Sequence, residues 1–205
     1  MLLLITGASG VGKSTTRFAI ANELDDVESI ELWHLGPIPA IPTVAWRQEL
    51  VEQVVQRAIA LDTEGRHLLF AGDPVAAGEA LAAPSSDRVD IAVCLLHANE
   101  EAQTTRLRAA GHSDGLLFNN LGYANWMRHH ATDPSFVHEA LTNNSWPAMR
   151  CERWSGLENG DPRWAMTVID TSNLAKEEVA AWALHGFGMR SRARLRCSER
   201  AGSSS

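Results

Sequence analysis

Short apolar runs alternate with longer segments of helical periodicity along most of this chain. The apolar runs have the length and composition of buried strands, and they cover residues 2–5, 67–71, 90–96 and 164–170; the more polar segment 27–33 is also expected to be a strand. The segments between them predict helices over residues 14–24, 43–61, 75–82, 100–110 and 175–185. The clearest helical period is in 43–61, where Thr43 is a candidate N-cap and Gly65 a candidate stop.

This alternation predicts an α/β fold with a parallel sheet and helices on both of its faces. Two segments do not fit the pattern. Residues 34–43 contain three prolines and predict no regular structure, and residues 111–163 are less regular, with Gly, Asn, His, Trp and Pro throughout. Ligands of such sheets bind beyond the carboxyl ends of the strands, so the loops that follow the strands are the places to search for chemistry.

Composition and charge narrow the class of protein. With 205 residues, 45% hydrophobic and 21% charged, the chain is long enough for one globular domain. The net charge of −7 argues against nucleic acid as the main ligand. No apolar run is long enough to span a bilayer, so we expect no membrane partner, and the apolar N-terminus predicts a strand and not a signal peptide.

The cysteines and the end of the chain add two expectations. Three cysteines are few, odd in number and widely spaced, which fits a reducing cytoplasm; they are Cys94, Cys151 and Cys197. The arginine-rich tail, 187–205, is expected to be disordered. The sequence does not predict an oligomeric state.

The strongest motif follows the first apolar run and matches GxxxxGK[ST] without a mismatch. It comprises Gly7, Ala8, Ser9, Gly10, Val11, Gly12, Lys13 and Ser14, followed by Thr15. Glycines let backbone N–H groups converge on one anion, and the next helix presents its positive end to the same phosphates. Lys13 supplies a charge to the β- and γ-phosphates, and the Ser14 hydroxyl is an oxygen ligand suited to Mg²⁺. The motif therefore predicts binding of ATP with Mg²⁺.

The motif and its setting resemble the small P-loop kinases, which include adenylate-kinase-like nucleotide kinases and gluconate, shikimate and chloramphenicol phosphotransferases. A GTPase would carry an Asn-Lys-x-Asp motif, which is missing here, and ring or motor ATPases need a longer chain. The resemblance covers 1–186 and implies a three-layer P-loop NTPase fold. It also implies a five-stranded parallel sheet in the order 2-3-1-4-5, with a helical lid insertion at 111–163.

The resemblance also implies roles for residues outside the loop. Asp73, in the turn after the third predicted strand, corresponds to a Mg²⁺ ligand or general base, although it could be a turn residue before proline. Arg106, or its neighbour Arg108, is expected over the γ-phosphate, the alternative being a solvated helix face. Further arginines of the lid segment are candidates to close on ATP: Arg128, Arg150, Arg153 and Arg163.

Two departures from the family's pattern bear on the site. Ala110 stands where adenylate-kinase-like enzymes carry a second arginine. Several small-molecule kinases place an aspartate after the second strand to bind or deprotonate the acceptor; here Trp33 and His34 stand there, and Glu31 is the nearest acid. Arg47 and His34 are possible acceptor anchors, with surface positions as the alternative.

The tryptophans of the lid segment allow two interpretations. Trp126, Trp146 and Trp154 could stack on a base or an aromatic acceptor, or they could form a small helical sub-core, and the sub-core is favoured.

We predict a cytoplasmic, Mg-ATP-dependent kinase that phosphorylates a small-molecule acceptor, either a nucleotide or a metabolite or antibiotic alcohol. The alternative is an ATP-binding regulatory or resistance protein with slow or no acceptor phosphorylation.

Overall fold

The sheet has the predicted strand order. The computed structural model describes residues 1–72 and 75–189, so Asp73, Cys197 and nearly all of the arginine-rich tail lie outside the described residues. The strands are β1 (Leu2–Thr6), β2 (Val27–Glu31), β3 (His67–Ala71), β4 (Ile91–His97) and β5 (Thr167–Asp170). They pair in parallel in the order β2-β3-β1-β4-β5, which confirms the expected α/β architecture.

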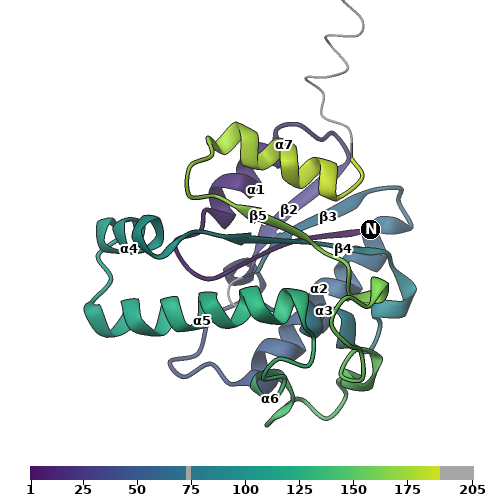
Figure 1. Ribbon diagram of the computed structural model, residues 1–205. Coiled ribbons are helices and arrows are strands. Elements are labelled where there is room, and N and C mark those ends of the chain that lie inside the picture. The colour runs from purple at the N-terminus through teal and green to yellow at the C-terminus, as the bar shows by residue number, and fades with distance from the viewer. Residues whose placement is uncertain (73–74, 190–205) are drawn as a thin grey trace, which may run out of the picture.

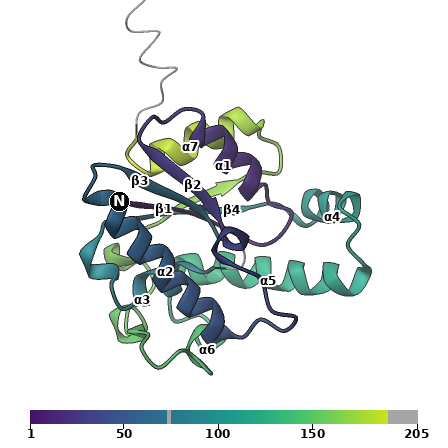
Figure 2. The ribbon, with the colours of Figure 1, turned by 180° about the vertical axis from the view of Figure 1, so that it is seen from behind.

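Helices cover both faces of this sheet. The longer ones are α1 (Lys13–Ala21), α2 (Val44–Asp62), α4 (Glu100–Ala109), α5 (Asp114–Thr132) and α7 (Lys176–Gly186). Shorter elements are α3 (Ala77–Ala82), α6 (Glu139–Thr142) and the 3₁₀ turns η1 (Leu32–Leu35), η2 (Ser86–Arg88), η3 (Cys151–Arg153) and η4 (Pro162–Trp164). Figure 1 shows α1 and α7 on one face of the sheet and α2, α3 and α5 on the other, and Figure 2 shows the same three layers from behind.

The place of β1 at the centre of the sheet explains why its residues 2–5 are all apolar. Leu3 and Ile5 of β1 belong to the hydrophobic cluster under α1 and α7. Leu2 and Leu4 belong to the opposite cluster, under α2, α3 and α5. Because successive side chains of a strand point to opposite faces, a strand with helices on both sides must be apolar throughout.

The largest difference from the local sequence pattern is α5, which forms part of the helical insertion that the resemblance implies. Residues 114–132 form one helix in a segment that the sequence predicts to be less regular. The helix contains Gly115, Gly122 and Asn125, which are poor helix formers, and its apolar stripe is weak. Burial of its second half against the core, including Trp126 and Met127, stabilises a helix that local propensity does not favour.

Two of the three lid-segment tryptophans form the favoured sub-core together with Trp164, just beyond the segment, whereas Trp146 is only half-buried. Trp126, Trp154 and Trp164 are at most 9% exposed. They surround His130, whose ring centroid lies 4.8 Å from that of Trp126, 5.4 Å from Trp154 and 5.2 Å from Trp164. These aromatic rings therefore pack the core on the α2 and α3 side of the sheet and do not form a ligand-stacking surface.

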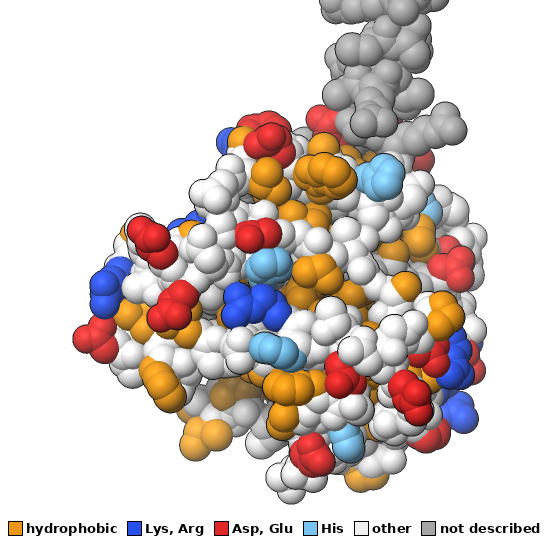
Figure 3. All heavy atoms as spheres, viewed as in Figure 1, with side chains coloured by type: hydrophobic (Ala, Val, Ile, Leu, Met, Phe, Trp, Pro, Cys, Tyr) orange, Lys and Arg blue, Asp and Glu red, His pale blue; other side chains and the backbone are white. Residues whose placement is uncertain are grey.

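Two observations concern the surface and possible membrane segments. On the face shown in Figure 3, acidic and basic side chains are interspersed, and the described residues form no continuous basic surface there. Across 1–72 and 75–189, every helix is too short or too polar to cross a bilayer.

Candidate functional site

The phosphate loop joins β1 to α1 at the carboxyl edge of the sheet, and its glycines adopt conformations that other residues rarely take. Gly7, Gly10 and Gly12 have φ angles of +142°, +82° and +97°. A Cβ atom on Gly7 would lie 2.3 Å from the carbonyl oxygen of Leu96, and one on Gly10 would lie 3.0 Å from a side-chain carbon of Leu107. The loop can therefore curl against β4 and α4 only with glycine at these positions.

Contacts from both sides hold the loop in place. Lys13, the first residue of α1, is 7% exposed and donates from Nζ to the carbonyl oxygen of Ala8 at 2.7 Å. Gln103 of α4 donates from Nε2 to the carbonyl oxygen of Ser9 at 2.8 Å. By contrast, Ser14 and Thr15 are exposed at the start of α1, where the helix N-terminus favours bound anions.

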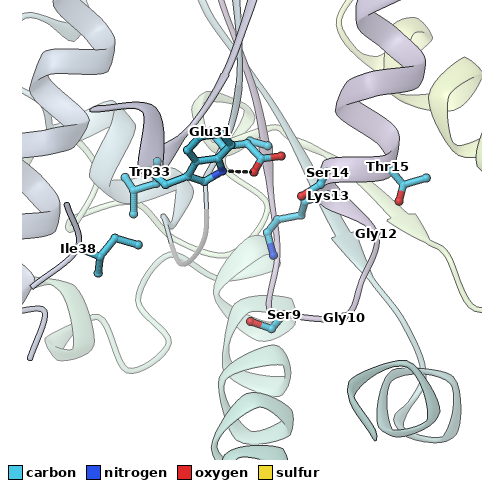
Figure 4. A pocket seen from close by; sticks show the side chains of 11 residues that line it. Ser9, Gly10, Gly12, Lys13, Ser14, Thr15, Glu31, Trp33 and Ile38 are labelled. Carbon is cyan, nitrogen blue, oxygen red and sulfur yellow. Dashed lines mark hydrogen bonds between the residues drawn. The ribbon is translucent and has the colours of Figure 1, made fainter. Parts of the chain in front are cut away.

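The loop forms one wall of a cavity of about 440 Å³. The opposite wall consists of residues from the ends of β2 and β3 and the segment after β2: Glu31, Leu32, Trp33, Ile38 and Ala71. In Figure 4, Trp33, Glu31 and Ser14 lie in a row, and Lys13 reaches into the space beneath them. The cavity therefore places a carboxylate and an aromatic side chain next to the phosphate loop.

Glu31 is the residue at this site whose importance the sequence shows least. Arg17 donates to Oε1 at 3.1 Å, and Trp33 donates from its indole nitrogen to Oε2 at 2.7 Å. Although burial alone would raise the pKa of Glu31, hydrogen bonds from Trp33, Ser14 and Arg17 lower it below its ordinary value. At neutral pH, Glu31 is thus an ionised carboxylate hydrogen-bonded to the serine of the phosphate loop.

β2 ends at Glu31, two residues before the predicted end, because the chain turns there into η1. His34 supports this turn: its Nδ1 accepts from the Glu31 backbone N–H at 2.9 Å, and its ring stacks on Trp33 at 3.7 Å. An acid at the end of the second strand was the only sequence signal for Glu31.

A second cavity, of about 240 Å³, lies on the other side of the loop. Its lining includes Gly12 and Thr15 from the loop region, Arg106 from α4, and Thr171, Leu174 and Val179 around the start of α7. The Arg106 guanidinium donates to the Thr171 hydroxyl at 3.0 Å and to the Thr171 carbonyl at 2.7 Å. Arg106 thus lines the second cavity and not the first, and its predicted role at the γ-phosphate stays a prediction.

The other candidate arginines are held by nearby groups. Arg153 donates to the Ala83 carbonyl at 2.7 Å, and Arg128 to the Asn125 side chain at 3.1 Å. Acidic partners lie beside the remaining ones, in the pairs Arg108–Asp114, Arg150–Glu152 and Arg163–Asp161. None of these arginines is among the described residues that line the two cavities.

Arg47 has a structural role instead of a surface position. It is paired with Glu79 of α3 at 2.7 Å, and the Glu79 side chain is fully buried. Burial alone would lower the pKa of Arg47, but the Glu79 carboxylate raises it above its ordinary value. The same carboxylate accepts from the backbone N–H of Ala76 at 3.1 Å, so the pair joins α2 to the start of α3.

Comparison with solved structures identifies the fold. A sugar kinase from a Janibacter species superposes with a TM-score of 0.61 at 15% identity, over 92% of this chain and 94% of that one. A gluconokinase from Sinorhizobium meliloti gives a TM-score of 0.54 at 18% identity, over 98% and 96%. This chain has the small P-loop kinase fold.

A third solved structure with this fold is described as a resistance protein and not as a kinase. The tunicamycin resistance protein of Deinococcus radiodurans gives a TM-score of 0.56 at 15% identity, over 93% of this chain and 96% of that one. No protein-family model matches the chain, and no curated protein matches its sequence. At sequence identities of 15–18%, the similarity to these structures establishes the fold alone, so the function has to be argued from the site.

Proposed function

We propose that this protein is a Mg-ATP-dependent phosphotransferase that phosphorylates a hydroxyl group of a small molecule. The observation that carries the proposal is the shared cavity in which the ionised Glu31 carboxylate lies beside Lys13 and Ser14 of the phosphate loop. A phosphate-binding loop alone fits many nucleotide-binding proteins. A carboxylate that faces the same space as the γ-phosphate subsite favours transfer to an alcohol, because the hydroxyl must lose its proton to a base during the reaction.

The donor side is assigned to the loop and the second cavity. The positive-φ glycines leave the inner surface of the loop open for phosphate oxygens, and α1 directs its N-terminus there. Lys13 neutralises charge on the β- and γ-phosphates. The second cavity, lined by Arg106 and Thr171, is proposed to hold the nucleoside end of ATP, because Gly12 and Thr15 of the loop region line both cavities.

The metal site is assigned to hard oxygen ligands. The Ser14 hydroxyl is exposed at the start of α1 and suits Mg²⁺. Asp73 remains our proposal for the carboxylate that would help Ser14 to hold the ion. When bound, Mg²⁺ neutralises phosphate charge as it develops during transfer.

On the acceptor side, Glu31 is proposed to orient the hydroxyl and take its proton. The acceptor oxygen then forms a bond to the γ-phosphorus, the bond from that phosphorus to the bridging β,γ-oxygen breaks, and ADP leaves with that oxygen. Arg17 and Trp33 fix the two Glu31 oxygens, so the carboxylate is oriented before the acceptor binds.

The proposal is tested by measuring ADP release with a panel of sugars, aminoglycoside-type alcohols and nucleoside monophosphates. We expect an alcohol to raise ATP turnover above the rate without acceptor. The Lys13→Ala variant should lose ATP binding and turnover, whereas Arg66→Ala, which changes a surface cation on neither cavity, should keep both.

Two results would contradict the proposal in different ways. Undiminished ATP binding by Lys13→Ala would remove the phosphate-loop assignment. Tight ATP binding with no acceptor-stimulated turnover would favour the alternative, an ATP-binding regulatory or resistance protein. The fold likeness to a tunicamycin resistance protein is the observation that keeps this alternative in view.

A further inference from the structure

The wall of the first cavity that faces the phosphate loop has a distinct chemistry of its own. We propose that the acceptor is an uncharged alcohol with a flat apolar or aromatic group, which stacks on Trp33 while its hydroxyl meets Glu31. This inference rests on the proposed function, since it specifies the substrate class of that same site.

The charges around the cavity argue against an anionic acceptor. Among the described lining residues, the one cation is Lys13, and it belongs to the phosphate loop. Arg17 lies behind the wall but is 4% exposed, and its guanidinium donates to Glu31 and to the Ser29 hydroxyl at 2.7 Å. A carboxylate or phosphate on the acceptor would therefore meet the Glu31 anion with no cation of its own to pair with.

Trp33 is an exposed aromatic side chain that is nevertheless held in one orientation. It is 60% exposed. Its indole nitrogen is fixed by Glu31 at 2.7 Å, and its ring stacks on His34 with planes 24° apart. An exposed indole held at its edge and stacked on a neighbouring ring is a preorganised stacking surface, because little side-chain entropy is lost when a ligand packs on it.

Ile38 extends this apolar surface. It lines the same cavity, is 53% exposed, and lies between Pro37 and Pro39, which restrict the backbone on both sides. Figure 4 shows Ile38 on the Trp33 side of the cavity, away from the phosphate loop. The apolar part of an acceptor would thus lie between Trp33 and Ile38.

The order of side chains in the cavity fixes how the acceptor must be built. Glu31 lies between Trp33 and Ser14 (Figure 4), and Trp33 bonds directly to Glu31. The hydroxyl that reacts must therefore be only a few bonds from the flat group. The cavity of about 440 Å³ has room for a single ring with a short hydroxylated arm beside a phosphoryl group.

Four small probes test charge and ring separately. They are 1-phenyl-1,2-ethanediol, which has a ring and no charge; mandelate, which has a ring and a carboxylate; ethylene glycol, which has neither; and glycolate, which has the carboxylate alone. Binding to protein saturated with Mg²⁺ and a non-hydrolysable ATP analogue is measured by calorimetry, and ADP release is measured with ATP. We expect the phenyl diol to bind at least about tenfold more tightly than the other three probes.

Variants then locate the ring. Trp33→Ala should weaken phenyl-diol binding about tenfold without changing the affinity for the ATP analogue. Trp33→Phe loses the hydrogen bond to Glu31 but keeps an aromatic ring, so it should retain most of the phenyl-diol binding. Trp182→Ala is the matched control, because Trp182 of α7 is 59% exposed and lines neither cavity.

Several results would overturn the inference. These are mandelate binding as tightly as the diol, ethylene glycol binding as tightly as the diol, no binding of either ring probe, or unchanged diol binding in Trp33→Ala. In all of these the ATP analogue still binds, and the proposed function is judged separately, by whether any alcohol of the wider panel raises ADP release. If the wild-type protein does not bind the ATP analogue, the proposed function fails, and the inference fails with it.

Discussion

At the scale of single residues, Glu31 connects more of the site than any other described side chain. Its carboxylate receives hydrogen bonds from Arg17 and Ser14 of α1 and from Trp33 of η1. One residue thus ties the helix that follows the phosphate loop to the turn that carries the apolar wall. The proposed catalytic role depends on the position of this carboxylate, whereas the stacking role depends on the indole that it fixes.

Replacing Glu31 by glutamine tests the catalytic role. Glu31→Gln keeps the shape of the side chain but cannot take a proton at neutral pH, so kcat should fall about 10²- to 10⁴-fold. The affinity for ATP should stay close to wild type, because Glu31 holds no phosphate. Steady-state kinetics with a working acceptor and calorimetry with the ATP analogue measure the two quantities.

Glu28→Gln is the matched control for that substitution. It lies on the same strand and loses an ion pair with Arg57, but it does not line the first cavity. It should keep wild-type kcat. Wild-type kcat in Glu31→Gln would leave Glu31 as a residue that only positions Trp33. A thermal melt of both variants shows whether Arg17, left without its charged partner, destabilises the fold.

At the scale of elements, the sequence predicts those whose signal is local. Four of the five strands are found because each is largely apolar, whereas β2 contains Glu28, Ser29 and Glu31. α2 is found because its buried face follows helical spacing and Thr43 caps it, accepting from Trp46 N–H at 3.1 Å. The resemblance implies a helical lid at 111–163, but the local pattern does not locate α5, because its helical state depends on packing with distant elements. The phosphate loop is likewise a local motif. The role of Glu31 could not be predicted locally, because it depends on the fold bringing the end of β2 beside α1.

The contact between α3 and η3 shows how the lid segment is joined to the sheet. A Cβ atom on Gly78 of α3 would lie 2.9 Å from two ring carbons of Trp154, which is 1% exposed. Gly78→Ala should therefore lower the free energy of unfolding by about 1–3 kcal/mol, because the indole cannot move out of a packed core without cost. Urea unfolding followed by circular dichroism measures the change.

Gly122→Ala provides the opposite expectation within the same fold. Gly122 also lies in a helix, α5, but a Cβ atom there would meet no heavy atom within 4 Å. Alanine should raise the free energy of unfolding by about 0.5–1 kcal/mol through its better helix propensity. If Gly78→Ala is as stable as the wild type, the packing of Trp154 on Gly78 does not control the attachment of this segment.

At the scale of the whole molecule, the two hydrophobic layers differ in character. The layer under α1 and α7 is aliphatic apart from Cys94 and Phe187, whereas the layer under α2, α3 and α5 includes three tryptophans around His130. The aromatic layer joins segments that are far apart in sequence, since the indole nitrogen of Trp164 donates to the His130 carbonyl at 2.9 Å. A change of charge at His130 would therefore act on the whole of this layer.

His130 makes the stability of the molecule depend on pH. It is 2% exposed, and neither ring nitrogen has a hydrogen-bond partner within the described parts of the chain. Burial lowers the pKa of His130 to about 4, against weaker opposing contributions from the Phe136 backbone and Asp133. The His130 ring is therefore neutral in the folded state at neutral pH.

The direction of the effect follows from the two pKa values. Above about pH 6.5, His130 is neutral in both the folded and the unfolded state, and its full contribution to stability is present. Between about pH 6.5 and 4, His130 binds a proton in the unfolded state but stays neutral in the folded state, so the free energy of unfolding falls by about 1.4 kcal/mol per pH unit, or about 3 kcal/mol in all.

Urea unfolding at pH 7.0, 6.0 and 5.0 measures this slope in the wild type and in His130→Phe, which keeps a ring against Trp126 but has no group to protonate. His129→Phe is the control, because His129 is exposed one position earlier on the same helix. We expect His130→Phe to flatten the slope and His129→Phe to leave it unchanged; equal slopes in all three proteins would mean that His130 does not link the aromatic layer to pH.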